Sequence, residues 1–534
     1  MGLYTNKRIP AAVVLICCFL FAGCKKQRTF EAAKPFTLDI ETTIGNLAEV
    51  FLPGAVSVEG YGVIGNLRGT GSAECPPQIR DYLQKYILKQ LPDIDASGFL
   101  SSADTAVVFL EGVIPAGTYK NQSFDLLVTA LTGTQTTSLE GGWLYGAELK
   151  PAGRLGPSIR VLARAQGAVF MDTLSDEVSD PTTGYILSGG RVLDESQINV
   201  SLREPDYEVA GLIRNRINGR YGKDIAAAVS PGQIVVTVPS KYRKQKAKFA
   251  SLVTSTYVAQ TPQAIEARIL QLVGKLAGAA NKQQSEIALE AIGRQSLEKL
   301  SPLLSSSDEE VCLNAARCML NLGSEKGLEA LRRIATNENS LYRIEALEAI
   351  NESAEKVVAA AISRTLLRDD DFDVKLAAYK SLKELDDITI MSDYVGRKLY
   401  LEQVTQTRYK GIYVTRSDRP TIVLFGGSLR CRENVFIQSP DGDITINARP
   451  SEPYVSIIRK HPRRPDTKPI QLKSTYEVGD IIRTLCEEPV RENQSGRPGL
   501  NVSYSEVIAL LRQMCQKGAI EAEFRKGPPP KIGL

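Results

Sequence analysis

The spacing of hydrophobic residues divides the chain into regions of different character. Between residues 45 and 260, short apolar runs such as residues 106–110 alternate with turn residues, which predicts strands. Two segments have helical spacing instead: residues 77–89, and a stretch that runs from Asp206, a good N-cap, to Tyr221. Residues 45–260 are therefore expected to form a β-rich α+β region.

The spacing becomes helical throughout residues 261–390. Small residues recur there at intervals of 28, 30 and 32, and a large aliphatic residue follows each of them four positions later. A small side chain lets two helices approach, and the large side chain one turn later fills the groove between them. A period near thirty is typical of an α-solenoid, so the segment resembles HEAT repeats; an irregular helical bundle is the alternative. The recurring pairs are Ala288 and Ile292, Ala316 and Leu320, Ala346 and Ile350, and Ala378 and Leu382.

Strands return in residues 391–470, where an apolar run at 421–425 is followed by the hairpin signal Asp441-Gly442. Residues 471–534 then predict a pair of helices and a final strand. The chain as a whole is expected to be a multidomain α+β protein in which a helical array separates two β-rich parts.

Two capping boxes mark the expected helix starts in the closing unit. Ser474 precedes Glu477, and Ser503 precedes Glu506, at the spacing in which each side chain bonds the other residue's backbone amide. Gly518 ends the second helix, and alternating apolar residues predict the strand after it. These alternating residues are Ile520, Ala522 and Phe524.

The first residues have the composition of an export signal. Lys7 and Arg8 precede an apolar run, residues 11–22, which suits a signal peptide and is short for a membrane-spanning helix. Residues 20–24, Leu-Phe-Ala-Gly-Cys, resemble a lipobox. We therefore expect a lipoprotein signal peptide over residues 1–23, lipidation of Cys24 and a linker over residues 24–44; a plain secretory signal is the alternative.

Composition removes several classes of chemistry. The formal net charge is +4 over 534 residues, so no global field favours nucleic acid as a partner. His461 is the single histidine and no C-x-x-C pair occurs, which argues against a histidine-based triad, a zinc site or a redox motif. We expect no catalytic residues, no cofactor and no metal. Six cysteines outside the signal and lipobox allow fifteen pairings, and the spacing selects none: Cys75, Cys312, Cys318, Cys431, Cys486 and Cys515.

Two short motifs that resemble ligand-binding sites are better explained as local structure. Gly60-x-Gly62-x-x-Gly65 matches the dinucleotide fingerprint, but the residues after it break helices, so we interpret it as a glycine-rich turn. Residues 369–371 and Asp373 could suggest calcium. They lack the glycine and terminal glutamate of a helix-loop-helix site and are better explained as the cap of a helix that starts near residue 374.

Each of two basic runs has both a functional and a structural explanation, and the sequence does not decide between them. Residues 241–248 carry five lysines and arginines beside aromatic residues, and residues 459–464 carry four. Either run could meet an anionic cell-wall polymer or lipid headgroups. Runs of this kind are more often solvated helix faces and loops.

Both ends of the chain resemble one known family, the flagellar P-ring proteins of bacteria. The resemblance covers about residues 45–258 and 415–526, and the helical repeats lie between the two parts. It is carried by a series of short motifs in the same order and spacing. They are Glu59 to Gly71, residues 124–129, 138–142, 165–167 and 188–190, then residues 478–485, 505–511 and 517–524.

The resemblance implies β-rich P-ring-like domains split by a HEAT-like insert, and a structural protein, not an enzyme. It implies a homo-oligomeric ring in the periplasm that surrounds the flagellar rod as a bushing at the peptidoglycan layer. The implied partners are further copies of the chain, the rod, outer-membrane ring components and peptidoglycan. Lipid at Cys24 would add an anchor in the outer membrane. The insert is expected to bulge from the subunit as an accessory.

The main alternative is a binding protein: an envelope lipoprotein that uses the repeats as a scaffold for protein partners outside motility. A cell-wall enzyme is a weaker alternative, because no paired carboxylates or nucleophile–base set has a meaningful spacing.

Overall fold

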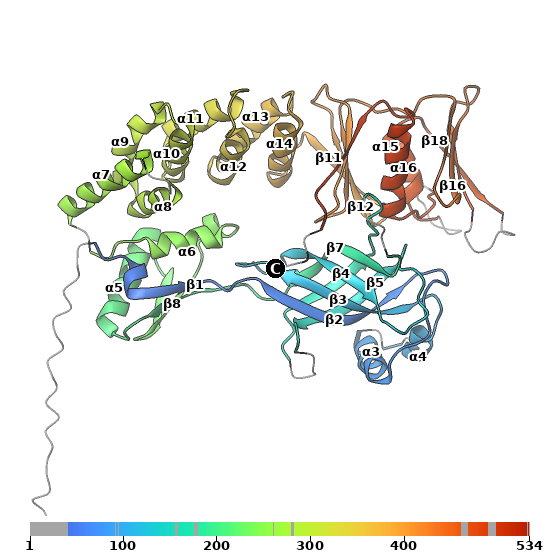
Figure 1. The fold of residues 1–534 in the computed structure, drawn as a ribbon, viewed down its shortest axis with the longest axis horizontal. Helices are drawn as coiled ribbons and strands as arrows, with labels where there is room; N and C mark the ends of the chain where they lie inside the picture. The colour runs from blue at the N-terminus through green and yellow to red at the C-terminus, as the bar shows by residue number, and fades with distance from the viewer. Residues whose placement is uncertain are drawn as a thin grey trace, which may run out of the picture.

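The computed structural model describes residues 41–530 and 532, apart from 91, 94, 155–158, 176–179, 260, 279–281, 461–467 and 490–497. The signal peptide, Cys24 and His461 therefore lie outside the described residues. Four bodies follow one another along the chain, and Figure 1 shows them arranged in two tiers. The barrel and a small α/β unit form one tier, and the helical array and a C-terminal unit form the other.

The barrel is a closed sheet of antiparallel strands in the order β2-β3-β4-β7-β6-β5. Inward-facing aliphatic residues such as Val108, Leu126 and Ile186 are fully buried in its core. Two helices, α3 (Pro77–Gln90) and α4 (Ala96–Leu100), lie outside the barrel against β2 and β3. The strands are β2 (Val56–Gly65), β3 (Ala106–Ile114), β4 (Ser123–Ala130), β5 (Trp143–Pro151), β6 (Ala163–Ala168) and β7 (Thr183–Val192).

The glycine motif lies inside β2, so its interpretation as a turn is wrong. A Cβ atom at Gly60 would stand 2.3 Å from the carbonyl oxygen of Glu148, and one at Gly62 would stand 2.7 Å from the Leu144 side chain. Both neighbours belong to β5, where the register against β2 is interrupted and the barrel closes. The glycines therefore permit close approach of two strands, and the motif does not open a helix as a nucleotide site requires.

The small α/β unit has a separate core, although residues 45–260 were expected to form one region. Its antiparallel sheet has the order β1-β8-β10-β9. Asp206 caps α5, and Gly222 ends it with a positive φ, as the sequence predicts. Helices α5 and α6 supply Ile213, Ile217 and Phe249 to the core. The elements are α2 (Ile44–Leu47), β1 (Ala48–Phe51), β8 (Ile198–Leu202), α5 (Tyr207–Tyr221), β9 (Ala226–Ser230), β10 (Gln233–Val236), the 3₁₀ turn η1 (Ser240–Tyr242) and α6 (Lys246–Thr254).

The array consists of stacked helix pairs, as the spacing predicts. The four recurring alanines lie on α8, α10, α12 and α14, and all are buried. Consecutive helices of this set contact one another. The helices are α7 (Pro262–Gly278), α8 (Lys282–Ile292), α9 (Leu297–Leu300), α10 (Glu309–Asn321), α11 (Glu325–Thr336), α12 (Arg343–Ser353), α13 (Lys356–Leu366) and α14 (Phe372–Glu384), with 3₁₀ turns η2 (Arg294–Ser296) and η3 (Ser301–Ser305).

The C-terminal unit places two helices between two sheets (Figure 1). One sheet has the order β11-β12-β14-β13-β19 and the other β15-β16-β17-β18. The elements are β11 (Ile390–Val395), β12 (Leu399–Val404), β13 (Gly411–Val414), β14 (Thr421–Phe425), β15 (Val435–Gln438), β16 (Ile444–Ala448), β17 (Val455–Arg459), β18 (Ile470–Ser474), α15 (Val478–Cys486), α16 (Tyr504–Gln516) and β19 (Glu523–Lys526).

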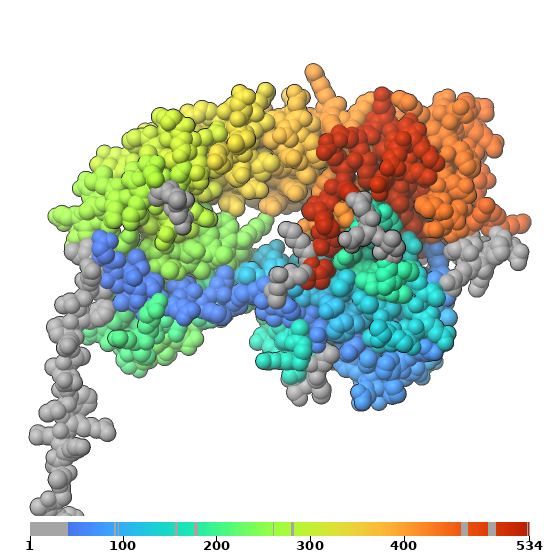
Figure 2. Space-filling model, in the orientation of Figure 1, coloured from blue at the N-terminus to red at the C-terminus, as the bar shows by residue number. Residues whose placement is uncertain are grey.

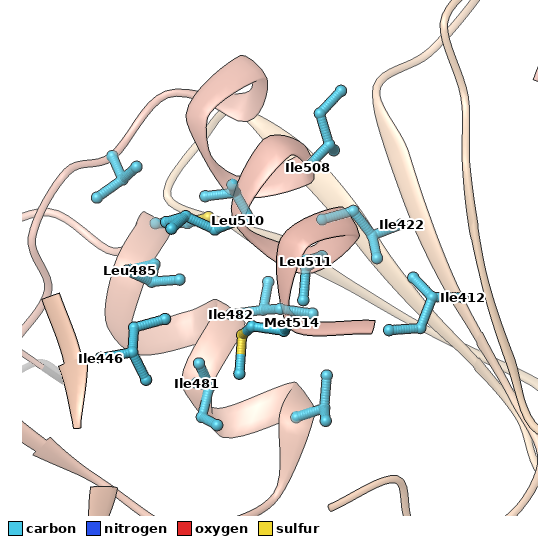
Figure 3. Packing of buried hydrophobic residues seen from close by; sticks show 14 of the residues in the cluster. Ile412, Ile422, Ile446, Ile481, Ile482, Leu485, Ile508, Leu510, Leu511 and Met514 are labelled. Atoms are coloured by element: carbon cyan, nitrogen blue, oxygen red, sulfur yellow. The ribbon is translucent and has the colours of Figure 1, made fainter. Parts of the chain in front are cut away.

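One core holds this unit together, so residues 391–470 and 471–534 fold as partners. Figure 3 shows Ile481, Ile482 and Leu485 of α15 packed with Leu511 and Met514 of α16. Strand residues from both sheets, among them Ile412, Ile422 and Ile446, close the core on either side. The structure thus has the pair of helices and the final strand that the sequence predicts for residues 471–534.

One of the two expected capping boxes is wrong. Ser503 and Glu506 form the box at the start of α16. Ser474 instead belongs to β18, pairs with Val455 of β17, and has no hydrogen-bond partner for its buried hydroxyl group. Helix α15 begins at Val478, four residues beyond Ser474, with Glu477 at the N-cap position.

The array does not bulge from the molecule as an accessory. One end packs on the small α/β unit through α8 and α6, and the other packs on the sheet of the C-terminal unit through α14. Figure 2 shows the array lying over the small unit and reaching the C-terminal unit. The four bodies form a closed circuit of contacts, which we call the frame.

Candidate functional site

A buried ion pair joins the barrel to the C-terminal unit. Asp172 lies in the connection between β6 and β7, and Arg416 lies between β13 and β14. Arg416 Nε donates to Asp172 Oδ1 over 3.0 Å and to Oδ2 over 3.2 Å, and Nη2 also donates to Oδ2. The residues are 9% and 7% exposed. Such a pair fixes relative orientation, because neither charge has water as an alternative partner.

Four further contacts surround this pair and cross the same interface. The Met171 amide donates to Ser505 Oγ over 2.9 Å, and Lys526 Nζ donates to the Leu174 carbonyl oxygen over 3.0 Å. The Asp418 amide donates to the Asp125 carboxylate, and the rings of Phe170 and Tyr504 pack at 5.6 Å. Segments from the two ends of the chain therefore fold against each other.

The first basic run lies within the frame, and only part of it is a solvated face: Lys241, Arg243 and Lys244 are exposed, but Lys246 is buried. Lys246 is 2% exposed, and its Nζ donates to the carbonyl oxygens of Thr118 and Ser196 and to the Glu195 carboxylate. Thr118 lies in the β3–β4 connection and the other two in the β7–β8 connection. Lys246 thus ties α6 to the barrel.

Other members of the run face the array. Lys241 Nζ donates to the Asn321 carbonyl oxygen over 2.7 Å, and Lys248 Nζ lies 3.5 Å from the Glu290 carboxylate. Arg220 of α5 adds bonds to two carbonyl oxygens at the end of α8. The run is thus a clamp between three bodies. The aromatic residues beside the lysines are the one sequence signal that part of this run packs against protein. In the structure the rings of Tyr242 and Phe249 stack with their centroids 5.1 Å apart.

Helix α14 joins the array to the C-terminal sheet. Glu402 of β12 is 1% exposed, accepts a hydrogen bond from the Tyr379 hydroxyl group, and lies 2.8 Å from Lys383 Nζ. Burial and Glu402 raise the pKa of Tyr379, so its hydroxyl group remains a donor. Phe372 packs on the Phe425 ring at 5.9 Å. This contact completes the frame.

A polar pocket of about 330 Å³ opens where the barrel meets the C-terminal unit. Charged side chains of both signs line it, three basic and four acidic. The barrel contributes Arg68 and Glu140, and the C-terminal unit contributes Lys398, Asp441, Asp443, Arg459 and Glu506.

The pocket shifts the titration of its groups. Burial lowers the pKa of Lys398 to about 8, although its Nζ donates to the carbonyl oxygens of Asn501 and Val502. Desolvation by the surrounding protein, with the charges of Glu506 and Asp441, raises the pKa of Glu140 to about 7. Glu140 carries its carboxyl group on the barrel side of the interface, so its charge state affects the contact between the two bodies.

We expect the Glu140→Gln variant to flatten the pH dependence of stability. Glu140 has a folded-state pKa above its ordinary value of 4.5, so folding takes up a proton between about pH 4.5 and 7. The free energy of unfolding therefore falls as pH rises through that window. Glutamine does not ionise, so the variant should not lose this stability. Thermal unfolding between pH 5 and 8 measures this: the variant should gain stability at pH 8 and change little at pH 5. Equal profiles for both proteins would contradict the role of Glu140.

The remaining candidate residues have structural positions. Asp371 caps α14 by accepting from the Asp373 amide over 2.8 Å, which confirms the predicted cap, and Asp369 pairs with Arg343. Within the described part of the chain, no group of three or more His, Cys, Asp or Glu residues is placed to hold a metal ion. Arg459 of the second basic run is buried and donates to the Leu500 carbonyl oxygen, whereas residues 461–464 lie outside the described residues.

The six cysteines from Cys75 to Cys515 are free thiols in the structure, and four of them are buried. None of the described helices has both the length and the apolar character that crossing a membrane requires.

Comparison with known proteins assigns two parts of the chain. Residues 44–270 match the sequence profile described as flagellar P-ring protein, and residues 285–387 match HEAT repeats. The second match confirms the repeat prediction over the bundle alternative. The first match ends at residue 270, so the resemblance of residues 415–526 stays a prediction.

Individual relatives match between about a third and two fifths of the chain. The flagellar P-ring protein of Thermotoga maritima is 28% identical over 236 residues, 41% of this chain and 67% of that protein. The one from Geobacter metallireducens is 26% identical over 209 residues, 36% of this chain and 54% of that protein. The one from Rhodospirillum rubrum is 30% identical over 198 residues and spans half of that protein. The chain therefore joins a segment similar to flagellar P-ring proteins to a segment of HEAT repeats.

Proposed function

We propose that this protein is a structural subunit of a flagellar P-ring: copies assemble head to tail into a closed ring in the periplasm, around the rod, as a bushing at the peptidoglycan layer. The similarity of residues 44–270 to proteins named flagellar P-ring protein carries this proposal. The ring's partners would be the rod, outer-membrane ring components and peptidoglycan. The proposal assigns no catalytic residue and no cofactor.

The closed frame supports a subunit of this kind. A ring closes only when every subunit repeats the same angle, so a subunit with loosely hinged bodies would give open or irregular assemblies. Here, buried polar contacts brace three junctions between bodies: Asp172 with Arg416, Lys246 with the barrel connections, and Glu402 with Lys383. The repeats act in this proposal as a brace that spans two of the other bodies.

Electron microscopy of detergent-extracted envelopes tests the ring proposal. Tagged protein should appear in rings around flagellar rods, and a strain without the gene should assemble no such rings and should not swim. Rings that persist in the deletion strain would refute the assignment.

Lipidation of Cys24 gives a separate expected result. The wild-type protein should incorporate labelled fatty acid and fractionate with outer membranes, because a lipobox cysteine is acylated after export. Cys24→Ser should lose the label. Cys75→Ser, which removes a partly exposed thiol from the mature chain, is the matched control and should keep it. A wild-type protein that incorporates no label would leave a plain secretory signal, and equal labelling of the Cys24 variant would place the lipid at another residue.

A second candidate function is a lipoprotein scaffold that binds protein partners through its repeats, outside motility. The open groove on the array between α12 and α14, described below, favours it. Purified protein that stays monomeric, together with a deletion strain that swims normally, would select this candidate over the ring.

A further inference from the structure

The array has an open groove between α12 and α14 with a volume of about 370 Å³. Its floor is apolar and its rim is mostly acidic. Leu347 and Leu376 contribute to the floor, and Glu348, Asp373 and Glu384 are exposed on the rim. Among the described residues that line the groove, Lys380 alone is basic. Grooves that bind peptide segments typically have an apolar floor surrounded by a polar or charged rim.

Negative charge on the groove is incompletely neutralised. Glu345 and Glu352 stand on the same helix as Glu348. Burial, with the charges of these two neighbours, raises the pKa of Glu348, although Lys380 opposes the shift. A cationic partner would relieve this crowding of carboxylates.

Lysine side chains of the small α/β unit already form ion pairs with glutamates of the array. Helix α6 and the residues before it place lysines against the array: Lys244 Nζ lies 3.4 Å from the Glu384 carboxylate, and Lys248 lies 3.5 Å from Glu290. Glu384 is also on the rim of the open groove. The groove therefore continues a surface whose occupied part binds ammonium groups.

The chain also contains a segment of complementary charge. Residues 460–468 read Lys-His-Pro-Arg-Arg-Pro-Asp-Thr-Lys, with four cationic residues against one aspartate. They connect β17 to β18, and the described ends, Lys460 and Lys468, are exposed. Figure 1 places β18 on the far side of the C-terminal unit from α12.

We propose that the groove between α12 and α14 docks the basic segment 460–468 of a second copy of this chain. This inference rests on the proposed ring and adds one of its subunit contacts. A head-to-tail ring joins two different surfaces of neighbouring copies, and these two surfaces are complementary in charge. The contact should weaken as salt rises, because the acidic rim of the groove is exposed and solvent ions screen it.

Charge exchange tests the contact. Glu348→Lys with Asp373→Lys, or Arg463→Glu with Arg464→Glu, should each weaken self-association about tenfold, measured by sedimentation of the full chain at low salt. The four changes together should restore it to within about threefold of wild type. Glu329→Lys with Glu338→Lys, exposed positions elsewhere on the array, is the control of equal charge change. Thermal unfolding checks that each variant folds.

A second measurement separates this inference from the ring proposal. A labelled synthetic peptide of residues 459–469 should bind the purified full chain, and the groove variant should lose that binding. If rings form in envelopes and both reversals leave self-association unchanged, the docking contact is refuted while the ring stands. If only the groove reversal weakens self-association, the groove contacts another part of the second copy and the named segment is wrong. If the wild type forms no rings in cells but binds the peptide, the ring fails and the docking surface stands.

Discussion

Replacing Arg416 with alanine should destabilise the contact between the barrel and the C-terminal unit by about 3–5 kcal/mol. The change leaves the Asp172 carboxylate buried without its counter-charge, and the lost bonds are not replaced by water. Because several bodies unfold separately in a chain of this size, hydrogen exchange is a better measurement than one melting temperature. Amides of β13 and β19 should exchange roughly a hundred-fold or more faster, since each 1.4 kcal/mol is a factor of ten.

Arg160 provides the matched control for this experiment. It forms an ion pair with Asp194 at 2.7 Å, but the two side chains are 72% and 58% exposed. Solvent screens such a pair, so Arg160→Ala should change stability by less than about 1 kcal/mol. Equal effects of the two substitutions would show that burial of the Asp172–Arg416 pair is not what holds the barrel to the C-terminal unit.

Removing Lys383 should loosen the junction between the array and the C-terminal sheet. Glu402 would keep the bonds from the Tyr379 and Ser392 hydroxyl groups and lose its counter-charge at 2.8 Å. Lys383 is 30% exposed, so the expected cost of Lys383→Ala is about 2–3 kcal/mol, below the range for fully buried pairs. Hydrogen exchange of β12 and α14 should rise, and limited proteolysis should cut the α14–β11 connection faster.

Lys244→Ala is the control on the same array. Lys244 pairs with Glu384 at 3.4 Å, with side chains 68% and 57% exposed. The loss of this pair should cost less than about 1 kcal/mol. If Lys383→Ala leaves the exchange of β12 unchanged, the array is not braced on the sheet, and its role in keeping the subunit rigid fails.

Local patterns predicted the elements whose environment repeats along the chain. Ala316 and Ala346 mark the helix stack because each repeat buries the same position. The spacing of Val507, Leu510, Leu511 and Met514 predicts the amphipathic stripe of α16, and all four are buried. Ser474 shows the limit of such patterns: it has the same box spacing as Ser503, but pairing of β18 with β17 holds it in a strand. Tertiary pairing overrides a local capping signal.

The candidate site was less accessible to sequence reasoning. Lys246 was counted among the residues of a surface charge run because its acceptors are remote in sequence: Thr118 lies 128 positions away and Ser196 lies 50. Asp172 and Arg416 are separated by 244 positions. No spacing rule links residues so distant, and the position of the array as a brace depends on the same long-range contacts.

The pairing of β19 with β13 has a consequence for biogenesis. Gly411 lies opposite Glu523, so the sheet against which α14 packs receives an edge strand synthesised about a hundred residues later. Until those residues arrive, β13 offers an unpaired edge and Leu174 lacks the Lys526 contact. A product truncated before residue 523 would therefore keep an unpaired strand edge on β13, which proteases and the strands of other chains could reach.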